Sequence, residues 1–172
     1  MDAIFIAIRT FLEAGGNVLY LIAGATFVMW AIIFERIWFI QTEHKTDVGK
    51  ALNYWESRPE RTSWNALRIR ERIISEVNSR LSVNLGFIKT LISLLPLLGL
   101  LGTVTGMINV FGVMAVSGSG NVRAMAAGVS QATVPTMAGM VGALSGVLLV
   151  TLLSRRAARE VEFLEDSLTM DH

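Results

Sequence analysis

No aspartate or glutamate occurs between Glu76 and Glu160, a gap of 83 consecutive positions in a chain of 172 residues. Within Leu81–Ser154 the only charged side chains are Lys89 and Arg123. Charged residues make up 17% of the chain, against about 25% in ordinary soluble domains. This segregation of charge excludes a soluble single domain and a disordered chain. The net charge of +1 also gives no reason to expect nucleic acid as a partner.

Three segments are long and apolar enough to cross a bilayer, which takes about 20 residues at a rise of roughly 1.5 Å each. The sequence therefore predicts an all-α membrane protein with transmembrane helices at residues 17–40, 85–116 and 124–153. The second and third are longer than a hydrocarbon core of about 30 Å requires, so we expect them to extend into the cytoplasm. The remaining segments are a cytoplasmic helical connection, a short periplasmic turn and a cytoplasmic helical tail, at residues 41–84, 117–123 and 154–172.

The first 16 residues do not form a continuous apolar run, and Asp2 stands where a cleavable signal peptide would be basic. Five apolar side chains instead fall on one helical face, namely Ile4, Ala7, Ile8, Phe11 and Leu12. This pattern predicts a short interfacial helix over residues 1–16, on the periplasmic side, ended by Gly15 and Gly16.

The distribution of Lys and Arg predicts the orientation. Ten of these residues lie within positions 36–89, and three more follow Ser154. Only Arg9 and Arg123 lie at the opposite ends of the predicted spans. Because basic residues stay on the cytoplasmic side, we expect a periplasmic N-terminus and a cytoplasmic C-terminus.

The cytoplasmic connection is expected to be helical. Ser63 is a suitable N-cap, and apolar residues recur after it at intervals of three and four. No strong helix breaker separates this pattern from the second span, so we expect one unbroken helix from Ser63 to Val116.

The sequence carries no sign of an enzyme. It has no phosphate-binding loop with Lys and Ser or Thr, no nucleophile elbow and no HExxH motif. It has no Cys and only two His, so we expect no disulfide, no metal site and no bound cofactor. The glycine-rich stretch Gly99–Gly106 lacks the Lys of a nucleotide-binding loop and lies inside an apolar helix.

Small residues in the second and third spans predict close helix packing. The pairs Gly102 with Gly106 and Gly142 with Gly146 each have the spacing at which two membrane helices approach closely. The predicted packing glycines are Gly99, Gly102, Gly106, Gly142 and Gly146.

Polar residues and prolines interrupt the same spans. Pro96 and Pro135 each remove a backbone donor and are expected to kink their helices. Pro135 lies close to Gln131, Thr133 and Thr136, and together the four form a polar defect in an apolar helix. A threonine hydroxyl in a membrane helix often bonds back to its own backbone, whereas the amide of Gln131 needs another helix or water. A helix–helix contact and a hydrated path are both consistent with this pattern.

Neither long span contains Asp, Glu or His. Proton relays in membranes use groups that take up and release protons. If this chain conducts protons, a partner must therefore supply the carboxylate.

Two stretches resemble the signature of the ExbB/TolQ/MotA proton-channel family. They are PLLGLLGTVTGMINVF (Pro96–Phe111) and GVSQATVPTMAGMVGAL (Gly128–Leu144), on either side of a short polar turn. The three-span arrangement with a periplasmic N-terminus resembles the ExbB/TolQ branch more than MotA, which has four spans.

The resemblance implies a pentameric ring in the bacterial inner membrane, and it implies protons as the transported ion. An ExbD-like single-span partner would carry the membrane Asp, and a TonB-like protein would relay the energy to outer-membrane transport. Thr103 and Thr136 match the family's threonines that line the proton path. Gln131 departs from the family pattern, because many relatives have Glu there. A TolQ-type role in envelope integrity and a passive scaffold for the partner are the alternatives.

Overall fold

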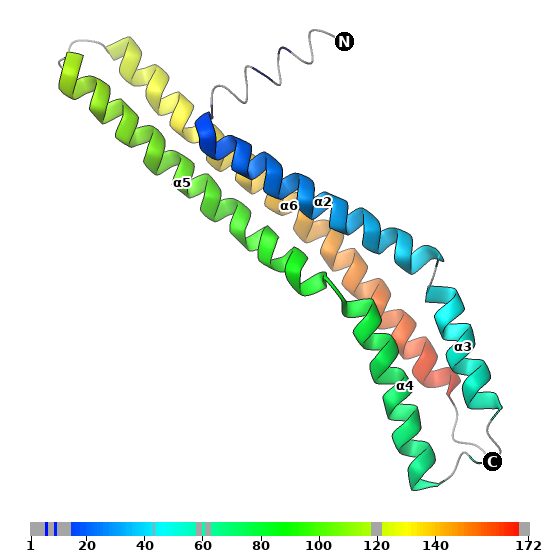
Figure 1. Cartoon of the computed structure of the whole chain (residues 1–172). Coiled ribbons are helices and arrows are strands. Elements are labelled where there is room, and N and C mark those ends of the chain that lie inside the picture. The colour runs from blue at the N-terminus through cyan, green and yellow to red at the C-terminus, as the bar shows by residue number, and fades with distance from the viewer. Residues whose placement is uncertain are drawn as a thin grey trace. The chain divides into compact units, whose positions relative to one another are not determined.

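The computed structural model describes residues 6, 9, 15–42, 44–57, 60, 63–117 and 122–168. Every element in these residues is a helix, and Figure 1 traces them along the chain from blue to red. They are α2 (Gly16–Thr42), α3 (His44–Glu56), α4 (Trp64–Ser82), α5 (Leu85–Ser117) and α6 (Val122–Ser167). The interfacial helix predicted over residues 1–16 lies largely outside the described residues.

Three helical stretches of the described chain are long and apolar enough to cross a membrane. They are Gly16–Thr42, Trp64–Val116 and Met125–Ser167. Each contains an 18-residue segment with a mean hydropathy of 2.0. The predicted all-α fold with three apolar helices is confirmed at this level. The helix α6 continues without interruption past Leu153, where the sequence placed the end of the third span.

The expectation of one unbroken helix from Ser63 to Val116 is wrong. Ser63 caps α4 as predicted, because its side chain accepts a hydrogen bond of 3.3 Å from the amide of Ala66. However, α4 ends at Ser82, and a turn at Val83 and Asn84 precedes α5. Asn84 has a φ of 64°, in the left-handed region that asparagine tolerates better than most residues. The turn breaks a helix that the apolar spacing alone would continue.

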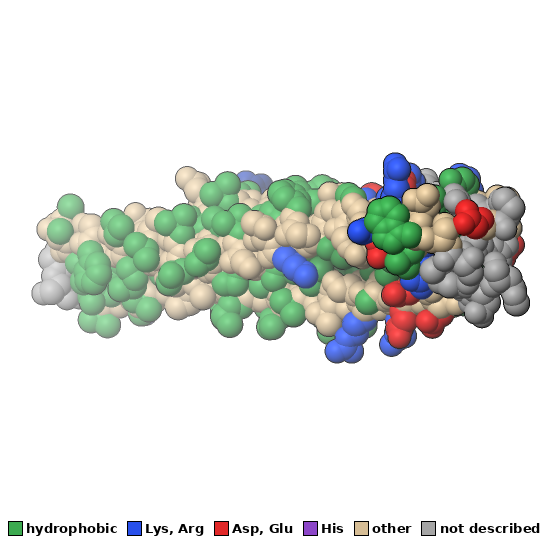
Figure 2. All heavy atoms as spheres, turned by 90° about the horizontal axis from the view of Figure 1, so that it is seen from below, with side chains coloured by type: hydrophobic (Ala, Val, Ile, Leu, Met, Phe, Trp, Pro, Cys, Tyr) green, Lys and Arg blue, Asp and Glu red, His purple; other side chains and the backbone are tan. Residues whose placement is uncertain are grey.

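The chain divides into two compact units. The first comprises Met1–Trp30 and Lys89–Val147. Here α5 and α6 form an antiparallel hairpin, and the first part of α2 packs against it (Figure 1). Hydrophobic side chains are spread along the visible surface of this unit, where few charged ones appear (Figure 2). Such a surface suits contact with lipid.

The second unit comprises Ala31–Ile88 and Leu148–His172. Its hydrophobic core joins α3, α4 and the end of α6 through Trp55, Leu81, Leu164 and Leu168, each at most 1% exposed. Arg70 fastens α4 to the end of α6, because it donates hydrogen bonds of 2.8 and 2.7 Å to the carbonyls of Leu168 and Glu165. Most of the charged side chains visible in Figure 2 gather over this unit.

A buried arginine holds the end of α4 within the second unit. Arg36 on α2 is 7% exposed and donates from Nη1 to the carbonyl of Arg80 at 3.2 Å. Its guanidinium also binds both carboxylate oxygens of Glu35, at 2.9 and 3.2 Å, and lies over the ring of Phe39. Arg36 thus satisfies a carbonyl in the last turn of α4, which the break at Val83 would otherwise leave without a helical partner.

Candidate functional site

The glycines of α5 bring its backbone against α6. A Cβ atom added to Gly99 would lie 2.9 Å from the Cα of Thr136, and one added to Gly106 would lie 2.5 Å from the Cβ of Ala132. A Cβ on Gly102 would meet the ring of Pro135. These three predicted glycines therefore lie at one continuous contact, where any larger side chain would force the helices apart.

The two predicted glycines of α6 face both α5 and α2. A Cβ on Gly142 would lie 3.0 Å from the hydroxyl oxygen of Thr26 and 3.3 Å from Leu95. At Gly146 it would lie 2.6 Å from the sulfur of Met29 and 2.7 Å from Ile92. Three helices therefore meet along this glycine edge of α6.

Two further glycines of the contact were missed by the sequence reasoning. A Cβ on Gly139 would lie 2.5 Å from the carbonyl oxygen of Leu95, and one on Gly128 would meet the side chain of Val110. A signal existed, because Gly128, Ala132 and Gly139 are separated by four and seven residues, which is about one and two helical turns along α6.

Thr136 uses its hydroxyl to join the two helices of the hairpin. Its Oγ1 donates a hydrogen bond of 2.9 Å to the carbonyl of Gly99, 37 positions earlier in the chain. The adjacent Pro135 is fully buried against α5, and the side chain of Thr136 is half-buried. The two residues lie in the helix–helix contact, which was one of the two explanations left open by the sequence.

Thr103 and Thr133 bond within their own helices instead. The hydroxyl of Thr103 donates to the carbonyl of Leu100 at 2.7 Å, and that of Thr133 to the carbonyl of Ser130 at 2.8 Å. Thr103 is half-buried and Thr133 is exposed. The two side chains thus lie at the outer surface of this single chain, with their hydrogens directed to the backbone.

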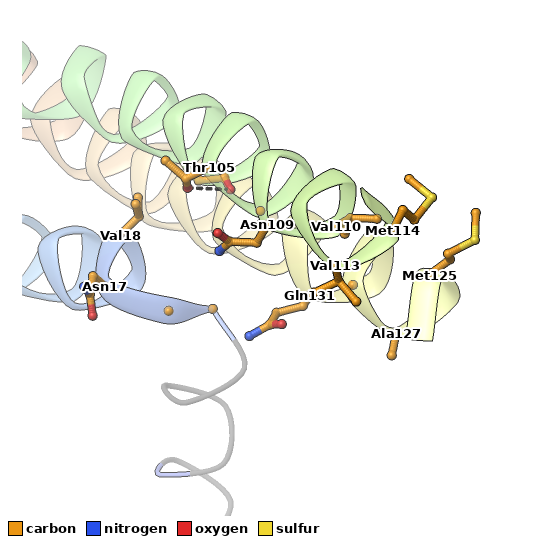
Figure 3. A pocket seen from close by; sticks show the side chains of 15 residues that line it. Asn17, Val18, Thr105, Asn109, Val110, Val113, Met114, Met125, Ala127 and Gln131 are labelled. Atoms are coloured by element: carbon orange, nitrogen blue, oxygen red, sulfur yellow. Dashed lines mark hydrogen bonds between the residues drawn. The ribbon is translucent and has the colours of Figure 1, made fainter. Parts of the chain in front are cut away.

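Gln131 lines a cavity of about 520 Å³ at the start of α2. Figure 3 shows Asn109 from α5 and Gln131 from α6 directed toward the same space, and Asn17 of α2 also lines the cavity. Thr105, one helical turn before Asn109, also lines it. The other lining residues are glycines and apolar side chains, so three amides and one hydroxyl provide its polar groups.

The structure divides the predicted site residues into separate groups. Gln131 lies in the cavity, Thr136 in the hairpin contact, and Thr103 and Thr133 at the surface. Pro96 and Pro135 stand inside α5 and α6, which continue through them. The sequence reasoning did not connect Asn17 or Asn109 with Gln131, although Thr105 and Asn109 share a helical face.

The hairpin offers acceptors and amides but no acid. Arg9, Lys89 and Arg123 are the only charged residues in the described part of the first unit, and it contains no His. Among the described residues of the chain, no group of three or more His, Cys, Asp or Glu could hold a metal ion. The chemistry of this site is therefore hydrogen bonding by neutral groups.

Comparison with known proteins gives one family. The model of the MotA/TolQ/ExbB proton channel family matches residues 41–166, which include α3 to α5 and nearly all of α6. A search of curated protein sequences found no match.

Proposed function

The chain belongs to the MotA/TolQ/ExbB proton channel family, and on this premise we propose that it is the ring-forming subunit of an ExbB-type energy-transducing complex. In this proposal it sits in the bacterial inner membrane and uses the proton motive force. It acts with an ExbD-like single-span partner and a TonB-like protein to energise transport across the outer membrane.

The observation that carries the proposal is that the hairpin presents hydroxyls and amides but no Asp, Glu or His. The described part of the first unit has four threonines with placed hydroxyls and an amide-lined cavity, yet no Asp, Glu or His. Such a wall can hydrate or hold a proton carrier but cannot itself take up and release a proton. The membrane Asp of an ExbD-like partner would supply that group.

The physics of the bilayer gives this arrangement a driving force. The anionic form of the partner's Asp is strongly disfavoured in a low-dielectric lumen. The side chain would therefore move along the inner wall of the ring in its protonated form. One elementary charge crossing 100 mV releases about 2.3 kcal/mol. That energy is sufficient to bias a modest rotation or shift of the partner relative to the ring.

One feature of the sequence supports the orientation, and one feature of the structure supports the ring. Thirteen of the 15 Lys and Arg residues lie in the segments assigned to the cytoplasm. Many large apolar side chains of α5 and α6 are exposed in the single chain, among them Leu97, Ile108 and Leu148 at 62 to 63%. Lipid, neighbouring copies and a partner helix would cover them.

A passive scaffold is the second candidate, favoured by the local hydrogen bonds of Thr103 and Thr133. A ring that only holds the partner needs the glycine contacts but no hydroxyl in a proton path. A TolQ-type role would use the same proton chemistry with different periplasmic partners.

The deciding experiment replaces the two threonines that match the family. The double variant Thr103→Val, Thr136→Val is reconstituted with the ExbD-like partner in liposomes, and proton flux is measured under an imposed potential. We expect flux to fall roughly tenfold while the complex still assembles, because a desolvated polar group that loses a hydrogen-bond partner costs about 1–3 kcal/mol.

The matched control is Ser93→Ala, which removes another hydroxyl of α5 that bonds back to its own helix, in this case to Lys89 at 3.1 Å. Its flux should equal that of the unaltered chain. Full flux in the double variant would overturn the proton-path role and leave the scaffold.

A further inference from the structure

A second hollow of about 530 Å³ lies in the second unit, between α3 and α4. Its apolar lining consists of Ala51, Ile69, Ile73 and Val77. Its polar lining consists of Lys50, Tyr54, Arg72, Glu76 and Arg80. We call these nine residues the basic groove. An apolar floor edged by cations suits an apolar side chain that is flanked by acids.

The charge of the basic groove is uncompensated. Glu76 and Arg80 form an ion pair with each other at 3.1 Å. Among the described side chains, neither Lys50 nor Arg72 has an ion-pair partner, although both line the groove. Two positive charges therefore remain available to an acidic group.

The end of α6 carries the complementary features on its outer face. Leu164 and Leu168 are buried in the core of the unit, whereas Phe163 is 59% exposed. Glu162 and Asp166 lie one position before and three positions after Phe163 on the helix, are exposed, and form no ion pair with any described residue. We call Glu162, Phe163 and Asp166 the acidic knob. An exposed aromatic ring near two unpaired acids on the same helix is expected to have a partner.

We propose that the basic groove of one copy receives the acidic knob of a neighbouring copy, with Phe163 over Ile69 and Ile73 and the two acids near Lys50 and Arg72. Because each copy has both surfaces, the contact is head-to-tail, and a repeated head-to-tail contact closes into a ring when its rotation permits. The inference rests on the proposed ring and identifies the cytoplasmic surfaces that join its members.

Within one copy, the basic groove and the acidic knob lie at a similar height along the helix axes. Arg70 binds the carbonyls of Glu165 and Leu168, so this part of α4 lies beside the end of α6 in the same copy. The two helices run in opposite directions (Figure 1), which places Ile73 near the level of Phe163. Rotation about an axis along the helices preserves this level, so the knob of a neighbour arrives at the height of the groove.

The test uses the absence of cysteine from the chain. One tagged copy carries Tyr54→Cys and a differently tagged copy carries Phe163→Cys, and the two are produced together with the full complex. Isolated membranes are then oxidised, because the cytoplasm keeps thiols reduced. We expect a disulfide-linked pair containing both tags, and a ladder of linked species when one chain carries both substitutions.

The matched control replaces Tyr54→Cys by Trp64→Cys, at an exposed position of α4 outside the groove. It should link to Phe163→Cys at least about fivefold less, the ratio that an energy difference near 1 kcal/mol produces. Equal linking of both pairs, in a ring that native mass spectrometry shows to be assembled, would overturn the groove–knob contact alone. Absence of any oligomer would overturn the proposed ring function as well.

Charge reversal distinguishes a neighbouring copy from an anionic lipid. Arg72→Glu in the Tyr54→Cys copy should lower the linking yield about two- to fivefold, the range of an exposed ion pair, and Glu162→Arg in the Phe163→Cys copy should restore it. A yield that stays low when both reversals are present, together with lost binding of the Arg72→Glu protein to vesicles of anionic lipid, would assign the groove to lipid and overturn the proposal.

Discussion

Gly106 illustrates how single residues set the geometry of the hairpin. The nearest atoms to its missing side chain belong to Ala132, at 2.5 and 2.7 Å from an added Cβ. Both are short, stiff parts of α6 and cannot rotate away. Gly112, two turns later on α5, has open space instead, since nothing lies within 4 Å of an added Cβ. Glycine is thus required for packing at position 106, whereas no contact within the chain requires it at position 112.

Gly106→Leu should therefore destabilise the hairpin, by about 1–3 kcal/mol or more, because an overfilled contact forces backbone shifts. The measurement is the unfolding midpoint of the purified chain in detergent, followed by circular dichroism. Gly112→Leu is the control and should stay within about 0.5 kcal/mol of the unaltered chain. Equal losses in both variants would mean that the hairpin contact at Gly106 does not limit stability.

The sequence could indicate which residues pack but not all of their partners. Small-residue spacing pointed to five glycines, and each of them has a close neighbour on another helix. The hydrogen bond from Thr136 to Gly99 could not be predicted, because it depends on the register between two helices. Gln131 was singled out as a side chain that its own helix cannot satisfy; the structure shows that it lines a cavity, which Asn17 from α2 also lines.

At the scale of elements, the junction of α4 and α5 departs most from expectation. Apolar residues recur at helical spacing through Val77, Leu81, Leu85 and Ile88, and that spacing carries no information about backbone handedness. The turn depends on the left-handed conformation of Asn84 and on the capping of α4 by Arg36. The sequence thus predicted the helices and their faces, whereas the break required tertiary contacts.

Substitutions at Asn84 should separate these causes. Asn84→Gly should preserve the turn and leave stability within about 1 kcal/mol, because glycine adopts a positive φ without strain. Asn84→Val should cost about 1–2 kcal/mol, since a β-branched side chain is disfavoured in that region. Unfolding midpoints of the two variants provide the comparison. If Val were as stable as Gly, the left-handed turn would not be required by the fold.

For the whole molecule, the main feature is the division of composition between the two units. The first has an apolar surface with neutral polar groups, and the second carries most of the charge, an arginine-capped helix end and a helical core. Apart from Arg9, Lys89 and Arg123, the polar side chains in the described part of the first unit are uncharged. In the proposed complex, the chain would surround a carboxylate that the described part of the first unit does not itself contain.

Proton flux should accordingly depend on the partner. The purified chain alone in liposomes should show flux close to that of empty vesicles at 100 mV. Addition of the ExbD-like partner should raise the flux, and replacement of the partner's membrane Asp by Asn should return it to the baseline. Flux through the chain alone that matched the complete complex would contradict the need for an external carboxylate.

The threonine hydrogen bonds determine what the hairpin can offer a visiting group. Thr103, Thr133 and Thr136 have each committed their one hydroxyl hydrogen to a backbone carbonyl. Their oxygens retain lone pairs, so they accept a hydrogen bond but have none left to donate. A neutral carboxylic acid brings the hydrogen that such an oxygen needs, whereas a carboxylate brings only more acceptors. In the proposed complex, these threonines would therefore select the loaded, proton-bearing form of the partner's acid over its empty form.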